Sequence, residues 1–317
     1  MAVICYQRPV PDDFDRYIYE AIVLGRSLPL DAVYNVVKHE SPRAEASSSL
    51  DSPQHLREIE PLYAIRLLYL KLIEALSGVL PVQHAINCIS ALSFLGIGIV
   101  VLLWTKAPLQ SALLMAYYPV LLLARMGTPD ALAALLSLSA LWLIDQKKEW
   151  FGFILLFLSL GVRTDSVLLL LAVLAWLAWE KRISFYIAAL MALFAVALVL
   201  GIDHWAGNYG WVVLFRFSFI AGRYPSQIPH TLSLGEYLSV FARGIGVLLT
   251  QLSLWILLGL WAWMRRPSPL LIVASVAVVL HFVLFPSPEV RYHMWAALVA
   301  AVALIQSFAE RSLRQKA

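Results

Sequence analysis

Long apolar runs follow one another from about residue 84 almost to the C-terminus, and they decide in which solvent this chain can fold. Of its 317 residues, 61% are hydrophobic and 14% are charged, whereas a soluble domain carries about 25% charged residues. Because so few charges cannot cover a water-facing surface, lipid is the expected solvent for most of the chain. The sequence therefore predicts an all-α integral membrane protein.

About nine of these runs are predicted to be membrane-spanning helices. They cover residues 84–104, 107–125, 129–144, 150–162, 165–179, 183–202, 240–263, 269–286 and 291–308. Several are shorter than the roughly 20 residues that a perpendicular span needs. In the weakest, 150–162, either the flanking residues complete the span or the segment is a re-entrant half-helix.

The loops between the spans fall into two sets that differ in charge. The short basic set comprises Lys106, 145–149, 180–182, Arg265 with Arg266, and the tail 309–317. By the positive-inside rule this set is predicted to be cytoplasmic, and the alternation holds only if 150–162 is counted as a span. The opposite set, predicted to lie outside, comprises 1–83, 125–130, 162–165, 203–239 and 287–291.

Residues 1–83 form the only substantially polar region. They contain the acidic stretch DDFDRY, a Ser-rich stretch that predicts a loop, and the apolar segment 61–80. That last segment carries Arg66, Lys71 and Glu74, each of which costs about 2.5–3.5 kcal/mol near the centre of an inserted helix. It is therefore predicted to be an interfacial helix, with a shorter one over 14–25. The chain thus divides into an external region 1–83, a membrane region 84–308 with an external loop 203–239, and a cytoplasmic tail 309–317.

Arginines persist on the predicted outer face, where the positive-inside bias should remove them. Most have an acid close by in sequence: Arg125 with Asp130, Arg163 with Asp165, Arg291 with Glu289, while Arg216 and Arg223 lie in the long loop. Guanidinium binds phosphate oxygens bidentately and stays charged, so a phosphate or pyrophosphate head group is a suitable partner. The alternative is that each arginine pairs with its neighbouring acid at a helix end.

Three carboxylates lie within four residues, at Asp12, Asp13 and Asp15. An ionised aspartate can act as general base towards a hydroxyl, and a pair of them can hold a divalent cation such as Mg²⁺ or Mn²⁺. The alternative is an acidic cap for a helix that begins near Phe14. His281 is a further polar residue, since it lies within an apolar span, where polar groups are often functional, or it reaches the nearby interface.

The order of these features resembles the GT-C superfamily of membrane glycosyltransferases, of the protein mannosyltransferase and aminoarabinose transferase type. DDFDRYIYEAIVLG is similar to the first external loop of that family, and EPLYAIRLLYLKLIEALSG is similar to its second interfacial helix. GTPDALAALLSLSALWL and VRTDSVLLLL resemble its short external turns, and PEVRYHMWAAL resembles the start of a late span. Only eleven residues precede Asp12, so the first membrane helix of the family is expected to be missing here.

The resemblance implies an inverting transferase that moves a sugar from a polyprenyl-phosphate donor to a glycan, lipid or protein hydroxyl on the non-cytoplasmic face. It implies Asp13 as the base, with Asp12 and Asp15 as close rivals. The residues expected to hold the lipid phosphate are Arg163, Arg291, Arg223, Arg125 and Tyr292. The further acidic contributors are Glu60, Asp130, Asp165 and Glu289. No metal requirement follows, although Asp12, Asp13 and Asp15 would be the ligands.

Two other functions fit the same features. A transporter or flippase of lipid-linked glycans is one, although transporters place their ionisable residues at mid-membrane depth. A non-catalytic subunit with a GT-C-like fold is the other, favoured by the missing first helix. Nucleic acid is excluded as a partner because no basic patch with interleaved aromatics occurs. The expected location is a bacterial inner membrane, with the active face periplasmic or extracellular and the C-terminus cytoplasmic.

Overall fold

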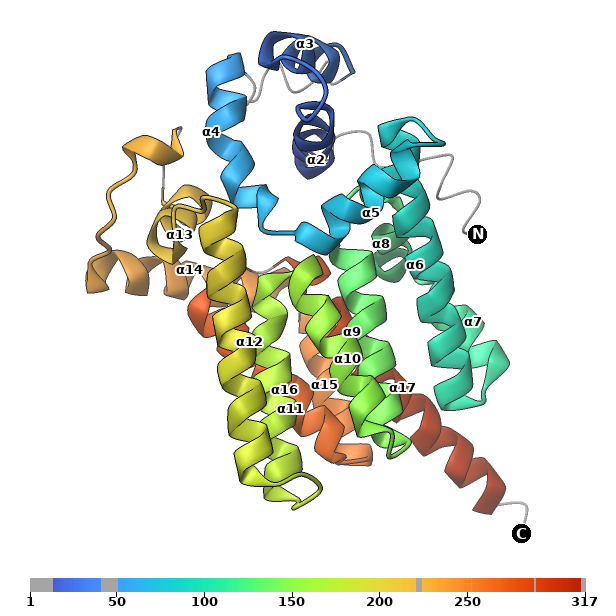
Figure 1. Cartoon of the computed structure of the whole chain (residues 1–317). Coiled ribbons are helices and arrows are strands. Elements are labelled where there is room, and N and C mark those ends of the chain that lie inside the picture. The colour runs from blue at the N-terminus through green and yellow to red at the C-terminus, as the bar shows by residue number, and fades with distance from the viewer. Residues whose placement is uncertain (1–13, 41–50, 221–223, 252, 288, 315–317) are drawn as a thin grey trace.

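A computed structural model describes residues 14–40, 51–220, 224–251, 253–287 and 289–314 of the chain. Every regular element in these ranges is a helix, which confirms the predicted all-α class. Figure 1 shows a helical bundle with α2 to α5 gathered across one end of it. We call this the covered end, and the other the open end.

The helices follow one another with short connections. Four of them lie at the covered end: α2 (Phe14–Leu24), α3 (Leu30–Glu40), α4 (Pro53–Ala64) and α5 (Leu67–Ser77). The next group is α6 (Val82–Thr105), α7 (Pro108–Ala116), α8 (Tyr118–Arg125), α9 (Asp130–Asp145), α10 (Glu149–Val162), the 3-10 turn η3 (Thr164–Ser166), α11 (Val167–Trp179) and α12 (Phe185–Trp205). The last group is α13 (Trp211–Phe219), the 3-10 turn η4 (Pro225–Gln227), α14 (Leu234–Gln251), α15 (Ser253–Arg265), α16 (Pro269–Leu284) and α17 (Val290–Arg314).

Two of the described helices, α6 and α12, are long and apolar enough to cross a membrane. The bent pairs α8 with α9 and α14 with α15 raise that number to four if each pair forms one span. The helices α10, η3 with α11, and α16 are apolar but shorter. Membrane-spanning character is therefore supported. The described helices provide two to four candidate spans by length and composition, and the nine predicted spans stay a prediction.

Two segments predicted as single helices are broken in the structure. The segment 107–125 divides into α7 and α8 at Tyr117, which has an extended backbone with φ −66° and ψ 128°. Pro119 explains the break, since proline supplies no backbone N–H and its ring clashes with the carbonyl four residues earlier. The segment 61–80 divides at Arg66, and its first part belongs to α4, which begins at Pro53 behind the N-cap Ser52.

The bundle core lies among α6, α9, α10, α11, α16 and α17, where fully buried side chains such as Ile97, Leu138 and Leu156 meet. Many of its members are alanines. Helices in lipid associate through close packing rather than through the hydrophobic effect, and small residues permit that approach. A second cluster packs α2 against α3 and α4 around Ile18 and Leu56, and a third joins α2 to α5 and α6.

Lysines in the left-handed conformation end three helices at the open end. Lys106, Lys147 and Lys181 have φ of 53°, 61° and 56° and directly follow α6 and the last turns of α9 and α11. A left-handed residue lets the chain turn away from a helix while its backbone N–H groups bond the last carbonyls. A cation there also interacts favourably with the negative end of the helix dipole. This end of the bundle is therefore basic.

Candidate functional site

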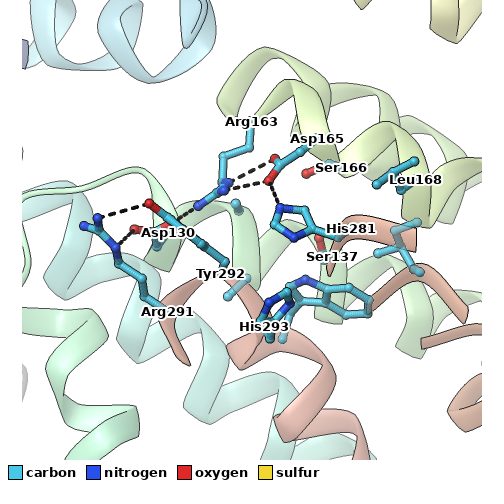
Figure 2. A pocket seen from close by; sticks show the side chains of 15 residues that line it. Asp130, Ser137, Arg163, Asp165, Ser166, Leu168, His281, Arg291, Tyr292 and His293 are labelled. Atoms are coloured by element: carbon cyan, nitrogen blue, oxygen red, sulfur yellow. Dashed lines mark hydrogen bonds and ion pairs between the residues drawn. The ribbon is translucent and has the colours of Figure 1, made fainter. Parts of the chain in front are cut away.

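Ionic side chains converge at the covered end, where α9 and α17 begin, α10 and α16 end, and α2 and α4 lie across the bundle (Figure 2). Arg163 follows α10 and points between Asp130, the first residue of α9, and Asp165 in η3. Its Nε donates to Asp165 Oδ1 at 3.0 Å, and its Nη1 donates to Asp130. The guanidinium of Arg163, at the end of α10, thus binds the carboxylates of both Asp130 and Asp165.

His281, near the end of α16, extends this arrangement. Its Nε2 lies 2.9 Å from Asp165 Oδ2. Its ring also lies 5.0 Å from the ring of His293, centroid to centroid, and 6.1 Å from that of Tyr292. Asp165 therefore links η3 to the last turn of α16 through one carboxylate, and a cavity of about 30 Å³ lies beneath these residues. That volume corresponds to about one water molecule.

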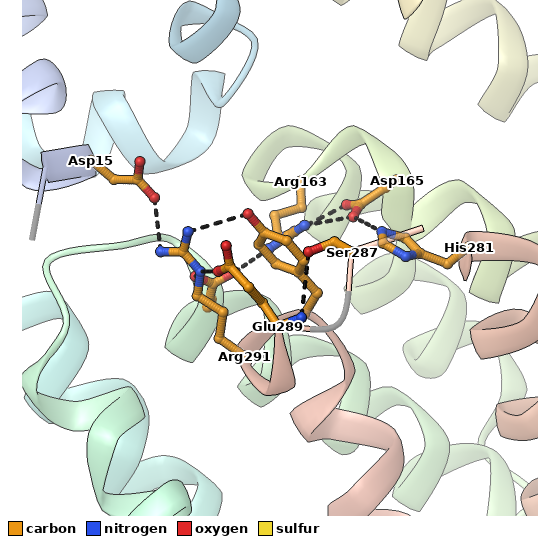
Figure 3. Close-up of polar contacts among 9 residues, drawn as sticks. Asp15, Arg163, Asp165, His281, Ser287, Glu289 and Arg291 are labelled. Atoms are coloured by element: carbon orange, nitrogen blue, oxygen red, sulfur yellow. Dashed lines mark hydrogen bonds and ion pairs between the residues drawn. The ribbon is translucent and has the colours of Figure 1, made fainter. Parts of the chain in front are cut away.

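Arg291 forms the second centre of the network, shown in Figure 3. Its Nη1 donates to Asp15 Oδ2 at 2.8 Å, which joins α17 to α2 across 276 residues of sequence. Its Nε pairs with Glu289 and lies 3.9 Å from Asp130 Oδ2. The ring of Tyr292 lies under both guanidinium groups, at 4.4 Å from Arg163 and 5.0 Å from Arg291. Stacking of this kind holds both cations in place.

Asp15 has a second partner in Tyr63 of α4, whose hydroxyl donates to Oδ1 at 2.8 Å. Burial, together with the nearby Asp15 carboxylate, raises the pKa of Tyr63 well above its usual value. Tyr63 therefore remains a neutral hydroxyl that donates to the carboxylate at physiological pH. Asp15 thus uses one oxygen for Tyr63 and the other for Arg291.

Arg66 differs from the other two arginines of this site. Within the described ranges no carboxylate lies within 4.0 Å of it, and its Nη1 donates to the backbone carbonyl of Leu62 at 2.7 Å. Its guanidinium lies 5.1 Å from the ring centroid of Tyr63 and 5.7 Å from that of Tyr19. The break between α4 and α5 places this cation at the wall of the cavity described next.

A cavity of about 310 Å³ lies beside the network. Its polar wall is formed by Asp15, Tyr63, Arg66, Arg163, Asp165 and His281. The rest of the lining comes mainly from α12, α13 and the end of α16. It is apolar at Val199, Leu214, Phe217, Leu284 and Phe285 and polar at Asp203, Asn208 and Ser218. A separate apolar groove of about 390 Å³ runs beside α12 between Leu67 and Trp205. A cavity that offers both an ionic cluster and an apolar surface suits an amphiphile.

The structure brings together eight of the residues singled out from the sequence: Asp15, Asp130, Arg163, Asp165, His281, Glu289, Arg291 and Tyr292. Arg125 ends α8 and Glu60 lies within α4, and neither lines the two cavities of this site. Arg216 pairs instead with Glu236 of α14. Asp12, Asp13 and Arg223 lie outside the described residues. Sequence reasoning did not select Tyr63 or Arg66 for this site.

The described ranges contain no group of three or more His, Cys, Asp or Glu side chains arranged to hold a metal ion. Asp15 lies within those ranges, whereas the two aspartates proposed as its fellow ligands do not. Comparison with family models, curated proteins and solved structures finds no match for this chain.

Proposed function

We propose that this chain is a membrane glycosyltransferase of the GT-C type, with nine membrane spans and a cytoplasmic C-terminus, in a bacterial inner membrane. It transfers a sugar from a polyprenyl-phosphate donor to a hydroxyl of a glycan, lipid or protein, with inversion, on the periplasmic or extracellular face. The observation that carries the proposal is the amphiphilic cavity at the covered end, where Asp15 and Arg66 share one wall.

The cavity matches the two parts of such a donor. A sugar phosphate needs ionic and hydrogen-bonding groups, which the wall with Arg66 and Asp165 supplies. The prenyl chain needs an apolar surface, which the α12 side of the cavity and the neighbouring groove supply. Gly201 lines that groove, and no heavy atom lies within 4 Å of the position that a Cβ would take there. This open surface leaves room for a lipid chain along α12.

The reaction needs one base and one group that holds the leaving phosphate. A carboxylate takes the proton of the acceptor hydroxyl, and the oxygen attacks the anomeric carbon from the face opposite the phosphate. The bond between that carbon and the phosphate oxygen breaks, and the phosphate leaves with the electron pair. In this proposal Asp15 takes the first role, because it lines the cavity and belongs to the acidic stretch in which Asp12 and Asp13 precede it.

In this proposal Arg66 takes the second role. A fixed cation aimed at the leaving group lowers the barrier because it stabilises charge that develops in the transition state. Arg163 and Arg291 already share Asp130, Asp165, Asp15 and Glu289, and so their charges are largely compensated. Arg66 lacks a carboxylate partner within the described ranges, and in this proposal a phosphate takes that place.

The test is sugar transfer from a radiolabelled pool of polyprenyl-phosphate donors, in membranes with matched expression of each variant. We expect Asp15→Asn and Arg66→Gln to lose at least about 100-fold in transfer, the size of typical effects of a general base or a charge-stabilising group. The matched control is Asp31→Asn, since Asp31 lies in the first turn of α3 as Asp15 does in α2. Asp12→Asn and Asp13→Asn complete the series, and EDTA tests the divalent cation.

If Asp15→Asn keeps the wild-type rate of transfer and either Asp13→Asn or Asp12→Asn loses it, the base is the residue whose substitution abolishes transfer. Transfer unchanged in all three would refute acid–base catalysis from this loop. An absence of transfer across a broad donor panel favours the non-catalytic subunit, which the compensated charges of Arg163 and Arg291 would suit.

A further inference from the structure

A second polar cavity, of about 230 Å³, lies at the open end of the bundle. Its lining comes from the ends of α6 and α9, the last turn of α11, the start of α16 and the second half of α17. The helices α9, α11, α16 and α17 therefore have one end at the candidate transfer site and run on to this cavity. It shares no lining residue with the cavities at the covered end.

Three cations line the cavity: Lys147, Arg182 and Arg266. Arg182 is held in place, because its Nε donates to Glu149 Oε1 at 2.9 Å and its Nη2 donates to the carbonyl of Ile144 at 2.7 Å. Asp145 is the carboxylate among the lining residues, and it accepts a hydrogen bond from Trp104 Nε1 at 3.0 Å. Three cations and one carboxylate therefore line the cavity, and Arg182 also pairs with Glu149, which lies outside the lining.

Neutral hydrogen-bond donors also meet this cavity. Trp176 lines it beneath Arg182, whose guanidinium lies 5.2 Å from the indole ring. The indole Nε1–H of Trp176 is buried and has no hydrogen-bond partner among the described residues. The first turn of α16, at Pro269 and Leu270, forms another part of the lining. Pro269 has no N–H, and the N–H of Leu271 bonds the N-cap Ser268, so the donor at this helix start is the N–H of Leu270. The positive end of the helix dipole also favours an anion there.

The α17 part of the lining is apolar at Val299, Val302 and Ala303, and its Gln306 donates to the carbonyl of Trp104. The surroundings are basic, since Lys106 and Lys181 follow α6 and α11 and Arg265 precedes Arg266. Basic pockets between membrane helices, next to a basic surface, are typical binding sites for anionic lipid head groups. The apolar wall supplies the surface that the glycerol and the first acyl carbons of such a lipid need.

We propose that this cavity binds the phosphate head group of an anionic phospholipid. Lys147, Arg182 and Arg266 face the phosphate oxygens, and the N–H of Leu270 and Trp176 Nε1–H supply neutral donors. The lipid would lie wedged between α11, α16 and α17 at the end opposite the candidate transfer site. The proposal does not depend on glycosyltransferase activity.

Native mass spectrometry of the purified full chain, with equimolar phosphatidylglycerol and phosphatidylcholine, provides the test. The cavity variant is Lys147→Gln with Arg266→Gln. The matched control is Lys181→Gln with Arg265→Gln. It removes the same charge, from another left-handed lysine and from the arginine that precedes Arg266, and neither residue lines the cavity. Each basic residue near an anionic lipid contributes about 1 kcal/mol, so we expect the cavity variant to bind phosphatidylglycerol about 30-fold more weakly.

The control variant should lose less than about threefold, since its cations act only through the membrane surface. Thermal unfolding of both variants in a neutral detergent shows whether they fold. Equal loss in the two variants, or no preference of the wild type for phosphatidylglycerol, would overturn the proposal. Glycerol phosphate and inorganic phosphate are added as competitors: displacement of the lipid at low millimolar concentrations would assign the cavity to a soluble phosphate, and persistence of the lipid supports the head group.

Discussion

The ion pair between Asp15 and Arg291 fastens the N-terminal helix α2 to the start of α17, and its strength can be measured. The two side chains are 21% and 16% exposed. They therefore lie between surface pairs, which contribute about 0–1 kcal/mol, and fully buried pairs, which cost about 3–5 kcal/mol when broken. We expect a coupling free energy of about 1–2 kcal/mol between these two residues, which corresponds to about 5–30-fold in an opening equilibrium.

Hydrogen–deuterium exchange of the α2 amides measures that opening. The four proteins are the wild type, Asp15→Asn, Arg291→Gln and the double variant. A double-mutant cycle is needed because Asp15 also bonds Tyr63 and Arg291 also pairs with Glu289, and the cycle cancels those contacts. The pair Lys71 with Glu74, three residues apart in α5, is the control, and it should couple by about 0.2–0.5 kcal/mol because the Lys71 side chain is 60% exposed. A coupling between Asp15 and Arg291 no larger than this would refute the reasoning.

Two further predictions concern helix packing and pH. Gly152→Ala should lower stability by about 1–3 kcal/mol, because its Cβ would lie 2.5 Å from Cγ1 of Ile144 and 3.0 Å from a backbone oxygen of Ala140. Gly246→Ala, which meets nothing within 4 Å, should leave the melting temperature unchanged or higher, and equal losses would contradict the packing argument. Burial raises the pKa of Glu60, with Arg57 opposing, so its ionised form weakens folding as pH rises above the unfolded value of about 4.3. Glu60→Gln should therefore raise the melting temperature more at pH 7 than at pH 4, and the reverse order would contradict it.

Helix positions were largely predictable because apolar runs and end signals agree. The expected segments 84–104, 183–202 and 269–286 correspond to α6, α12 and α16, and the last two begin behind the serine N-caps Ser184 and Ser268. The breaks were harder to foresee. Tyr117 and Arg66 lie within runs whose hydropathy continues across them, and hydropathy carries no information on backbone direction.

The site was predictable as a set of residue types on one face, but its pairings were not. Neighbours in sequence do pair, as Arg163 with Asp165 and Arg291 with Glu289. The contacts from Arg163 to Asp130 and from Arg291 to Asp15 span 33 and 276 residues and depend on how the helices pack. That packing cannot be inferred from hydropathy and motif spacing in one sequence. The sequence marked His281 by its apolar surroundings and Asp165 by its place beside Arg163, but it did not predict that the two side chains bond each other.

The lengths of the helices that connect the two ends have a consequence for the membrane itself. The helices α9, α10 and α16 have 16, 14 and 16 residues, which at 1.5 Å per residue is about 21–24 Å. A bilayer has a hydrocarbon core about 30 Å thick. On the proposed placement, the lipid around this part of the bundle must be thinner than average, or the Arg163 network lies several ångströms below the plane of the phosphates. Either way, a lipid-linked substrate would approach the network from the side, without first leaving the leaflet.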